Sequence, residues 1–416
     1  MAFYEIEEQA PERAMLVSVD TGEFDAAVSL AELAELTATA GAVVVDTAVQ
    51  KKEAPDKATC LGSGRAEELA TACAAQDIDL VIMDRELSPT QLRNLEEIFP
   101  CRVIDRTALI LDIFAGRARS AEGRLQVELA QLQYRLPRLA GQGTALSRLG
   151  GGIGTRGPGE TQLESDRRHI RRRISAIREQ LEKVESQRAL RRERRRKDGV
   201  ATVAIVGYTN AGKSTLLNRL TDAGVLAENK LFATLDPTAR GLRLPDGREV
   251  MLVDTVGFVR RLPHHLVQAF HSTLEEAVEA DVILNVCDAS SEHAAEHLQV
   301  TGDLLRELGC GDRPVLQVMN KCDLVPDIVA REDQRCLYIS AATGEGMAEL
   351  LQAVALALPP DRRKVKLLLP FSKGALAEQC RREGSVEHEE YVPEGLSMIV
   401  TLGARLLAET AEYVVE

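Results

Sequence analysis

The sequence predicts an α/β protein of several domains, and three observations support this. The 416 residues are too many for a single core, because chains longer than about 250–300 residues divide into domains. The first 115 residues alternate between strand-like and helix-like hydrophobic patterns, which is typical of βαβ units with a parallel sheet. Further on, an apolar strand pattern at 200–206 turns into a helical pattern at 214–220 through a glycine-containing turn.

The N-terminal region, residues 1–115, is expected to form an α/β domain. Strand-like patterns lie at 14–19, 42–49 and 79–83, and helix-like patterns lie at 26–40, 65–76 and 88–99. Ser88-Pro89 suits a helix start, because Pro fits the first helical position. We interpret Gly62-Ser63-Gly64 as a structural turn. A nucleotide site is the alternative there, but a lone G-x-G is a weak signal.

Charge is distributed unevenly along the chain. The net charge is −13, yet residues 117–198 carry 21 Lys and Arg against 10 Asp and Glu. An acidic protein with one concentrated basic segment indicates a polyanionic partner at that segment. The alternative is a charged helix that is merely solvated.

Cysteine use and hydropathy favour a cytoplasmic location. The eight cysteines include no C-x-x-C pair, which argues against a disulfide framework or a zinc site. The first 13 residues are acidic and lack the apolar stretch of a secretory signal. No run of about 18 apolar residues occurs, so no transmembrane segment is predicted. We expect a monomer.

Residues 116–198 are expected to form an antiparallel helical hairpin. Apolar residues recur at spacings of four and three in two seams, Leu125, Leu129, Leu132 and Leu136 in the first and Ile170, Ile174, Ile177, Leu181 and Val184 in the second. Such spacing is typical of coiled-coil helices. Because short helices are marginal alone in water, we expect the two seams to pack on each other. Pro137 should end or kink the first helix.

The tip loop between these helices, residues 141–159, is rich in glycine. Eight of its nineteen residues are Gly, and long loops without secondary structure are often functional. Glycines let the backbone follow an irregular surface, and arginines contact phosphates or stack on bases. A flexible tip without a partner is the alternative. The residues expected to contact a polyanion such as RNA are Arg148, Gly150, Gly151, Gly152, Arg156, Arg167 and Arg171.

Residues 199–358 contain a phosphate-binding motif. Gly207 to Ser214 reads G-Y-T-N-A-G-K-S, which fits G-x-x-x-x-G-K-[ST]. The strand before it and the helix after it aim backbone N–H groups and the positive end of a helix dipole at one point, which suits a triphosphate. Lys213 would reach the β- and γ-phosphates, and the Ser214 hydroxyl would ligate Mg²⁺.

Two later segments are expected to respond to the γ-phosphate. In 231–236, L-F-A-T-L-D, a threonine hydroxyl could ligate Mg²⁺, and spacing leaves both Thr234 and Thr238 open. A strand at 250–253 leads into Asp254-Thr255-Val256-Gly257. Asp254 suits a place beside the metal's direct ligands, and the Gly257 N–H suits a γ-phosphate contact.

The last motifs are expected to recognise the base. A strand at 315–319 leads to Asn320-Lys321-Cys322-Asp323. The Asp323 carboxylate can accept hydrogen bonds from guanine N1–H and the N2 amine, a donor pair that adenine lacks. Ser340-Ala341-Ala342, which follows a strand at 337–340, can offer N–H groups to the guanine oxygen. We therefore predict GTP and GDP as ligands.

These residues resemble a known family. The set GYTNAGKST, FATLD, DTVGF, NKCD and SAA is similar to the translation-factor class of GTPases, and within it to the HflX family. The basic hairpin with its GGIGTRGPGE loop is a hallmark of that family, so the resemblance covers nearly the whole chain. One departure is Arg65, where similar proteins often have Lys in a G-S-G-K stretch, and this weakens the case for ATP in the N-terminal domain.

The resemblance implies several properties. It implies that Ser214 and Thr234 ligate Mg²⁺, which decides between the two threonines. It implies binding to the RNA and proteins of the large ribosomal subunit, with the tip loop near the peptidyl-transferase centre. It also implies the splitting or rescue of stalled ribosomes under stress.

The predicted site can be stated in full. Lys213, Thr234 and Gly257 are expected to act in catalysis. The residues expected at the nucleotide are Gly207, Tyr208, Thr209, Asn210, Ala211, Gly212, Lys213, Ser214, Thr215, Phe232, Ala233, Thr234, Leu235, Asp236, Asp254, Thr255, Val256, Gly257, Asn320, Lys321, Asp323, Ser340, Ala341 and Ala342. Many GTPases place a water-orienting Gln directly after the D-x-x-G glycine, but Phe258 stands here. We predict slow intrinsic hydrolysis that a partner stimulates, unless another residue of the chain replaces the Gln.

Residues 359–416 are expected to form a small α+β domain that begins after Pro359-Pro360. Its predicted elements are a strand at 365–370, a helix at 372–383, a hairpin of 385–392 and 396–402, and a short helix within 404–414. Nothing in it indicates catalysis, so we expect a docking role.

The predicted fold class is therefore α/β, a P-loop GTPase domain flanked by an N-terminal α/β domain, a helical hairpin and a C-terminal α+β domain. The predicted function is a Mg²⁺-dependent GTPase associated with ribosomes in the cytoplasm, with the membrane periphery as a second location. Two alternatives stay open. One is a GTP-gated scaffold whose hairpin binds tRNA or anionic membrane, and the other is an ATP-driven enzyme, which Asp323 disfavours.

Overall fold

The computed structural model describes residues 10–139, 158–197, 200–221, 231–232, 236–261, 263, 278–325, 336–358 and 362–415. The chain forms two compact units, Met1–Glu182 with Glu228–Asp236 and Gly257–His271, and Lys183–Ala227 with Pro237–Val256 and Ser272–Glu416. Among the described residues, no helix combines the length and apolarity needed to cross a bilayer.

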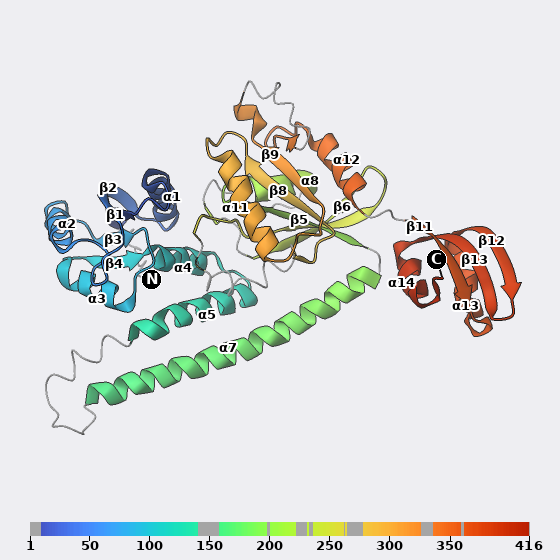
Figure 1. Cartoon of the computed structure of the whole chain (residues 1–416), viewed down its shortest axis with the longest axis horizontal. Helices are drawn as coiled ribbons and strands as arrows, with labels where there is room; N and C mark the ends of the chain where they lie inside the picture. The colour runs from blue at the N-terminus through green and yellow to red at the C-terminus, as the bar shows by residue number, and fades with distance from the viewer. Residues whose placement is uncertain are drawn as a thin grey trace, which may run out of the picture. The chain divides into compact units, whose positions relative to one another are not determined.

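The N-terminal domain is a four-stranded parallel sheet with helices on both faces (Figure 1). The strands are β1 (Arg13–Asp20), β2 (Val43–Lys51), β3 (Leu80–Met83) and β4 (Arg102–Asp105), in the order β2-β1-β3-β4. The helices are α1 (Ala26–Thr39), α2 (Ser63–Ala75), α3 (Pro89–Ile98) and α4 (Arg106–Arg117). The six predicted elements are confirmed, whereas β4 and α4 were not predicted.

The two faces of this sheet are covered by different helix pairs. Met15, Val17 and Val81 pack in one core with residues of α2 and α3. Leu16 and Ile82, the intervening residues, are also buried and point to the opposite face, where α1 and α4 contact each other. The predicted start of α3 is confirmed: Pro89 is its first residue, and Ser88 forms a capping box with Gln91.

The predicted helical hairpin is confirmed in α5 (Ala121–Arg138) and α7 (Pro158–Lys197). The two seams meet in a core of Leu129, Ile174 and Ile177, and the flanking residues are Leu125, Leu132, Leu136, Ile170 and Leu181. Pro137 lies in the last turn of α5, which ends one residue later. Most of the tip loop, residues 141–157, lies outside the described residues.

The second unit is built on a six-stranded sheet. Its strands are β5 (Ala201–Gly207), β6 (Thr238–Arg243), β7 (Glu249–Asp254), β8 (Val282–Asp288), β9 (Val315–Asn320) and β10 (Cys336–Tyr338), in the order β10-β9-β8-β5-β7-β6. Only β6 pairs antiparallel among these strands. The helices α8 (Lys213–Thr221), α11 (Ala294–Glu307) and α12 (Met347–Ala357) belong to the same unit.

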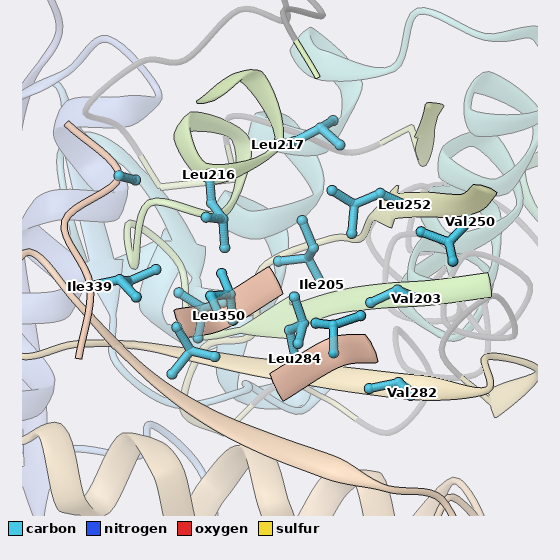
Figure 2. Packing of buried hydrophobic residues seen from close by; sticks show 14 of the residues in the cluster. Val203, Ile205, Leu216, Leu217, Val250, Leu252, Val282, Leu284, Ile339 and Leu350 are labelled. Carbon is cyan, nitrogen blue, oxygen red and sulfur yellow. The ribbon is translucent and has the colours of Figure 1, made fainter. Parts of the chain in front are cut away.

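The hydrophobic core of this unit packs the helices against the sheet. Val203, Ile205 and Leu284 lie in the sheet, and Leu216 of α8 and Leu350 of α12 pack against them (Figure 2). All five side chains are buried. The core therefore fixes where β5 ends and α8 begins.

The C-terminal domain is a three-stranded antiparallel sheet with two helices. The strands β11 (Arg362–Leu369), β12 (Ser385–Val392) and β13 (Gly395–Gly403) pair in the order β11-β13-β12. The helices α13 (Gly374–Glu383) and α14 (Ala404–Thr410) pack on this sheet. The predicted order of strands and helices is confirmed.

Candidate nucleotide-binding site

The strand order of the second unit locates a candidate site. The chain passes from β5 to β7 on one side and to β8 on the other, so the order reverses beside β5. In open parallel sheets, ligands bind at the carboxyl ends of the strands next to such a reversal. The loop that follows β5 is the predicted phosphate loop, and β7 and β9 end at Asp254 and Asn320.

The backbone of this loop requires glycine at two positions. Gly207 has φ +148°, and a Cβ there would lie 2.0 Å from the carbonyl oxygen of Val286. Gly212 has φ +88°, and a Cβ there would lie 2.3 Å from Asn320 Nδ2. Residues with a Cβ rarely adopt such φ values, and a Cβ at either position would collide with the neighbouring atoms. Both glycines are therefore needed to keep the loop close to its neighbours.

Lys213 lies beneath the loop and is buried. Its Nζ donates hydrogen bonds to the carbonyl oxygens of Gly207 at 3.1 Å and Tyr208 at 2.7 Å. Burial lowers the pKa of Lys213 to about 8, and the negative charge of Asp254 partly opposes this shift. Because burial disfavours the charged ammonium group of Lys213, an anionic ligand beside it would stabilise that charge.

Two hard oxygen donors lie side by side, one at the start of α8 and one at the end of β7. Ser214 Oγ donates to Asp254 Oδ2 at 2.8 Å, and Asp254 is fully buried. A hydroxyl and a carboxylate next to a phosphate loop fit a Mg²⁺ site, since this ion prefers oxygen ligands and phosphate. When bound, Mg²⁺ would neutralise charge on the phosphate oxygens. Thr234, the other predicted ligand, lies outside the described residues.

Asn320 links the phosphate loop to the end of the sheet. Its Nδ2 donates to the carbonyl oxygen of Ala211 at 2.8 Å, and its Oδ1 accepts from the N–H of Ala341 at 2.9 Å. The sequence motif identified Asn320 but not these two contacts. The Ala341 N–H is therefore engaged by Asn320, and Ser340 Oγ accepts from the N–H of Thr343 at 3.1 Å.

The motif expected to recognise the base, residues 320–323, contains a residue in the left-handed backbone conformation. Lys321 has φ +64°, and its Nζ pairs with Asp288 Oδ2 at 2.6 Å. Asp323 lies in the short helix η3 (Cys322–Leu324) and is exposed. Its carboxylate therefore faces solvent at the strand ends and could accept hydrogen bonds from a base.

Sequence reasoning did not find the aromatic contact of the phosphate loop. Tyr208 stacks on His297 of α11, with ring centroids 3.9 Å apart and an interplanar angle of 12°. Tyr208 was predicted as a loop residue, but the position of His297 in a helical segment gives no local signal for this contact.

Several predicted nucleotide residues belong to the first unit or lie outside the described residues. Phe232 is buried and packs edge-on against Phe114 of α4, with centroids 4.6 Å apart. Asp236 accepts from the N–H groups of Arg119 at 2.9 Å and Ser120 at 2.8 Å, at the start of α5. Gly257 also belongs to the first unit. Ala233 and Leu235, like Thr234, lie outside the described residues.

Some of the predicted RNA-contacting residues lie on α7, and the others lie outside the described residues. Arg171 is exposed and Arg167 is half-buried on α7. Their neighbour Arg173 makes a two-pronged ion pair with Glu128 of α5, at 2.6 and 2.7 Å. Arg148, Gly150, Gly151, Gly152 and Arg156 lie outside the described residues.

Comparison with known protein families gives three matches along the chain. Residues 27–115 match the family described as GTP-binding GTPase N-terminal, residues 117–195 the GTP-binding GTPase Middle Region, and residues 202–321 the 50S ribosome-binding GTPase family.

Curated relatives match over nearly their whole length. The protein named GTPase HflX from Caldanaerobacter subterraneus subsp. tengcongensis is 52% identical, and the match covers 93% of this chain and 90% of that relative. GTPase HflX from Escherichia coli is 44% identical over 93% of this chain and 92% of the relative. A solved GTP-binding protein from the archaeon Sulfolobus solfataricus, in complex with GDP, is 24% identical, with a TM-score of 0.44 over 83% of this chain and 98% of that one.

Proposed function

The chain belongs to the GTPase HflX family, and from this premise we propose that it acts on the large ribosomal subunit and uses its nucleotide state to control that attachment. It hydrolyses GTP to GDP and phosphate, as its GTPase domain indicates. The proposed task is the splitting or rescue of stalled ribosomes under stress, in the cytoplasm. The observation that carries this proposal is the presence in one chain of a guanine site and an exposed arginine face.

The arginine face lies on α7. Arg168, Arg171, Arg172 and Arg178 are exposed, whereas Arg173 is occupied by Glu128 and fastens α7 to α5. Arg168 also lies 3.8 Å from Glu164 on the same helix. Exposed arginines suit the phosphates of folded RNA, and such binding weakens as the salt concentration rises, because the release of counterions from the RNA then contributes less. The match to a family described as 50S ribosome-binding supports ribosomal RNA as the polyanion.

The nucleotide site is proposed to work with the residues of the second unit and two flanking segments. Lys213 would hold the β- and γ-phosphates, and Ser214 with Thr234 would ligate Mg²⁺ beside Asp254. Asp323 would select guanine. Gly257 would contact the γ-phosphate through its N–H, so that only the triphosphate engages this segment.

Intrinsic hydrolysis is proposed to be slow. Phe258 is buried and apolar, so its side chain cannot orient the attacking water as a Gln does. The ribosome would supply or reposition the missing group. Single-turnover hydrolysis, measured with and without purified large subunits, tests this: we expect stimulation by subunits, and a fast rate for the free protein would refute it.

Co-sedimentation tests the ribosome proposal directly. We expect pelleting with large subunits in the presence of a non-hydrolysable GTP analogue, less with GDP, and less at higher salt. The double variant Arg171→Ala/Arg172→Ala should weaken pelleting without changing GDP affinity. Arg306→Ala/Arg313→Ala, a double change in and just after α11, is the matched control. Equal binding to tRNA or anionic vesicles, with no preference for subunits, would favour the scaffold alternative.

A further inference from the structure

The segment that follows Gly257 is held by the N-terminal domain. Residues 257–261 and the N-terminal sheet belong to the same compact unit. Phe258 and Val259 are buried, with 2% and 3% of their surface exposed. Arg261 has φ +51°, a left-handed conformation that costs a non-glycine residue about 1–3 kcal/mol and persists only where its surroundings fix it.

Arg261 is fixed by three contacts from the N-terminal domain. Its Nη2 donates to Asp84 Oδ1 at 2.7 Å and to the Ser29 hydroxyl. Its guanidinium lies over the ring of Phe24, with Cζ 3.8 Å from the centroid. Asp84 follows β3, and Ser29 is a residue of α1, so the arginine is held from two elements of one domain.

Asp84 lies at the centre of a buried ion network. It is 1% exposed, and its Oδ1 also accepts from Arg106 Nη1 at 3.0 Å. Arg106 in turn pairs with Glu32 and donates to the carbonyl oxygen of Arg260 at 3.2 Å. Two guanidiniums thus face two carboxylates, and the segment is held by side chain and main chain together.

The same residues line a cavity of about 400 Å³ that includes Asp84, Arg85, Arg106 and Arg261. An anionic ligand is not favoured there. Arg85 pairs with Glu23, and the other two arginines pair with Asp84. The cluster therefore holds protein segments together and has its charge balanced internally.

We propose that Arg261 is a positioning residue for GTP, which holds segment 257–261 through Asp84 so that the Gly257 N–H is already ordered for the γ-phosphate. This proposal rests on the γ-phosphate contact of Gly257 proposed above. Four residues span at most about 14 Å, even fully extended, so anchoring positions 258, 259 and 261 confines Gly257. Ordering a backbone residue costs about 1–2 kcal/mol. A segment ordered in advance spares the triphosphate that cost, whereas GDP gains nothing because it lacks the γ-phosphate.

The test compares affinities for two nucleotides in the full-length protein. We expect Arg261→Ala to weaken binding of a fluorescent non-hydrolysable GTP analogue by at least about fivefold, the lower end of typical coupling between sites. Binding of fluorescent GDP should stay within about twofold. Arg261→Lys should restore part of the analogue affinity, because an ammonium can pair with Asp84 but presents no planar group to Phe24. Arg102→Ala, which removes an exposed arginine paired with Glu12, should change neither affinity.

The other possible outcomes would overturn the positioning role of Arg261. Equal losses for both nucleotides would mean a merely structural role, and unchanged affinities or tighter analogue binding would also overturn the proposal. If Arg261→Ala does not fold, Phe24→Leu removes the stacking of Arg261, together with the more distant contact of Arg85 on the same ring. It should give a smaller shift in the same direction, and its failure to do so would overturn the proposal equally. Thr234→Ala separates the two levels of the argument. If it fails to weaken the analogue selectively, the proposed triphosphate site is wrong, and if it succeeds while Arg261→Ala does not, the positioning role alone is wrong.

Discussion

Asn320 donates a hydrogen bond from its side-chain amide to the carbonyl oxygen of Ala211 at 2.8 Å. This bond joins the carboxyl end of β9 to the phosphate loop, and it is buried, since Asn320 is 2% exposed. The same amide holds the loop at Ala341 through Oδ1. One side chain therefore sets the spacing between the part of the site expected to hold phosphate and the part expected to hold the base.

Asn320→Asp should weaken the binding of both GDP and GTP by about 10- to 100-fold. The carboxylate oxygen would face the Ala211 carbonyl without a hydrogen to share, and an unsatisfied buried group costs about 1–3 kcal/mol. Titration with fluorescent nucleotides measures this. Asn94→Asp, which breaks a similar amide-to-carbonyl bond in the N-terminal domain, is the matched control. Nucleotide affinities that survive Asn320→Asp unchanged would show that the link does not matter for binding.

Asp323→Asn should shift base preference from guanine to xanthine. Guanine presents two donors to the carboxylate, whereas xanthine has an oxygen at C2 that accepts a hydrogen bond from an Asn amide. We expect GDP affinity to fall by at least about tenfold and xanthosine diphosphate affinity to rise, because a mismatched polar contact discriminates strongly. Competition against fluorescent GDP reads both values. Asp312→Asn, at another exposed position, should leave the preference alone, and a similar shift there would remove Asp323 from its assigned role.

The sequence predicted the phosphate loop well because its geometry is local. The fit to G-x-x-x-x-G-K-[ST] depends on residues 207–214, and the strand and helix on either side have clear hydrophobic periods. The collision of a Cβ at Gly207 with Val286 explains the first glycine. The hairpin was predictable for the same reason, since apolar residues recur at spacings of four and three within each seam, as at Leu125, Leu129 and Leu132.

Other features could not be predicted because their causes are not local. The four-residue strand β4 is too short to show a period, and Asp105 ends it while capping α4 through the N–H of Ala108. Asp236 was predicted at the nucleotide as part of segment 231–236. Its carboxylate accepts a hydrogen bond from the N–H of Ser120, which is 116 positions earlier. The sequence pattern around Ser120 or Asp236 does not predict that these two residues pair.

Asp236→Ala should lower the free energy of unfolding by about 1–2 kcal/mol, the usual range for losing acceptors at a helix start. The carboxylate now satisfies the N–H groups of Arg119 and Ser120, just before α5. Urea unfolding measures the change, and Asp236→Asn, which keeps one acceptor oxygen, should lose less.

Gly123→Ala provides a second test of the same contact. A Cβ at Gly123 would lie 2.3 Å from Asp236 Oδ1, so this change should displace the carboxylate and destabilise the wild type. In the Asp236→Ala background the collision is gone, and alanine favours a helix by about 1 kcal/mol over glycine. The same substitution should therefore become neutral or stabilising there. Additive losses in the double variant would refute the contact.

Two thiols are buried deeply enough to resist ionisation. Cys73 and Cys287 are 0% and 1% exposed. Burial raises the pKa of each to about 12, and the charge of Asp288 adds to the effect at Cys287. Both should react slowly with iodoacetamide in the native protein at pH 9 and quickly in urea, because the thiolate is the reactive form.

The raised pKa of Cys287 also predicts a pH-dependent stability. The unfolded thiol ionises near pH 9, whereas the folded thiol keeps its proton until about pH 12. The contribution of this thiol to stability is therefore fully present below pH 9 and is lost as the pH rises from 9 toward 12. Cys287→Ala removes the titrating group while its packing loss stays constant with pH. The difference in unfolding free energy between wild type and variant should therefore shrink by about 1 kcal/mol between pH 8 and pH 10. Urea unfolding at both values measures it, and a difference that does not change with pH would show that the folded thiol ionises as readily as the unfolded one.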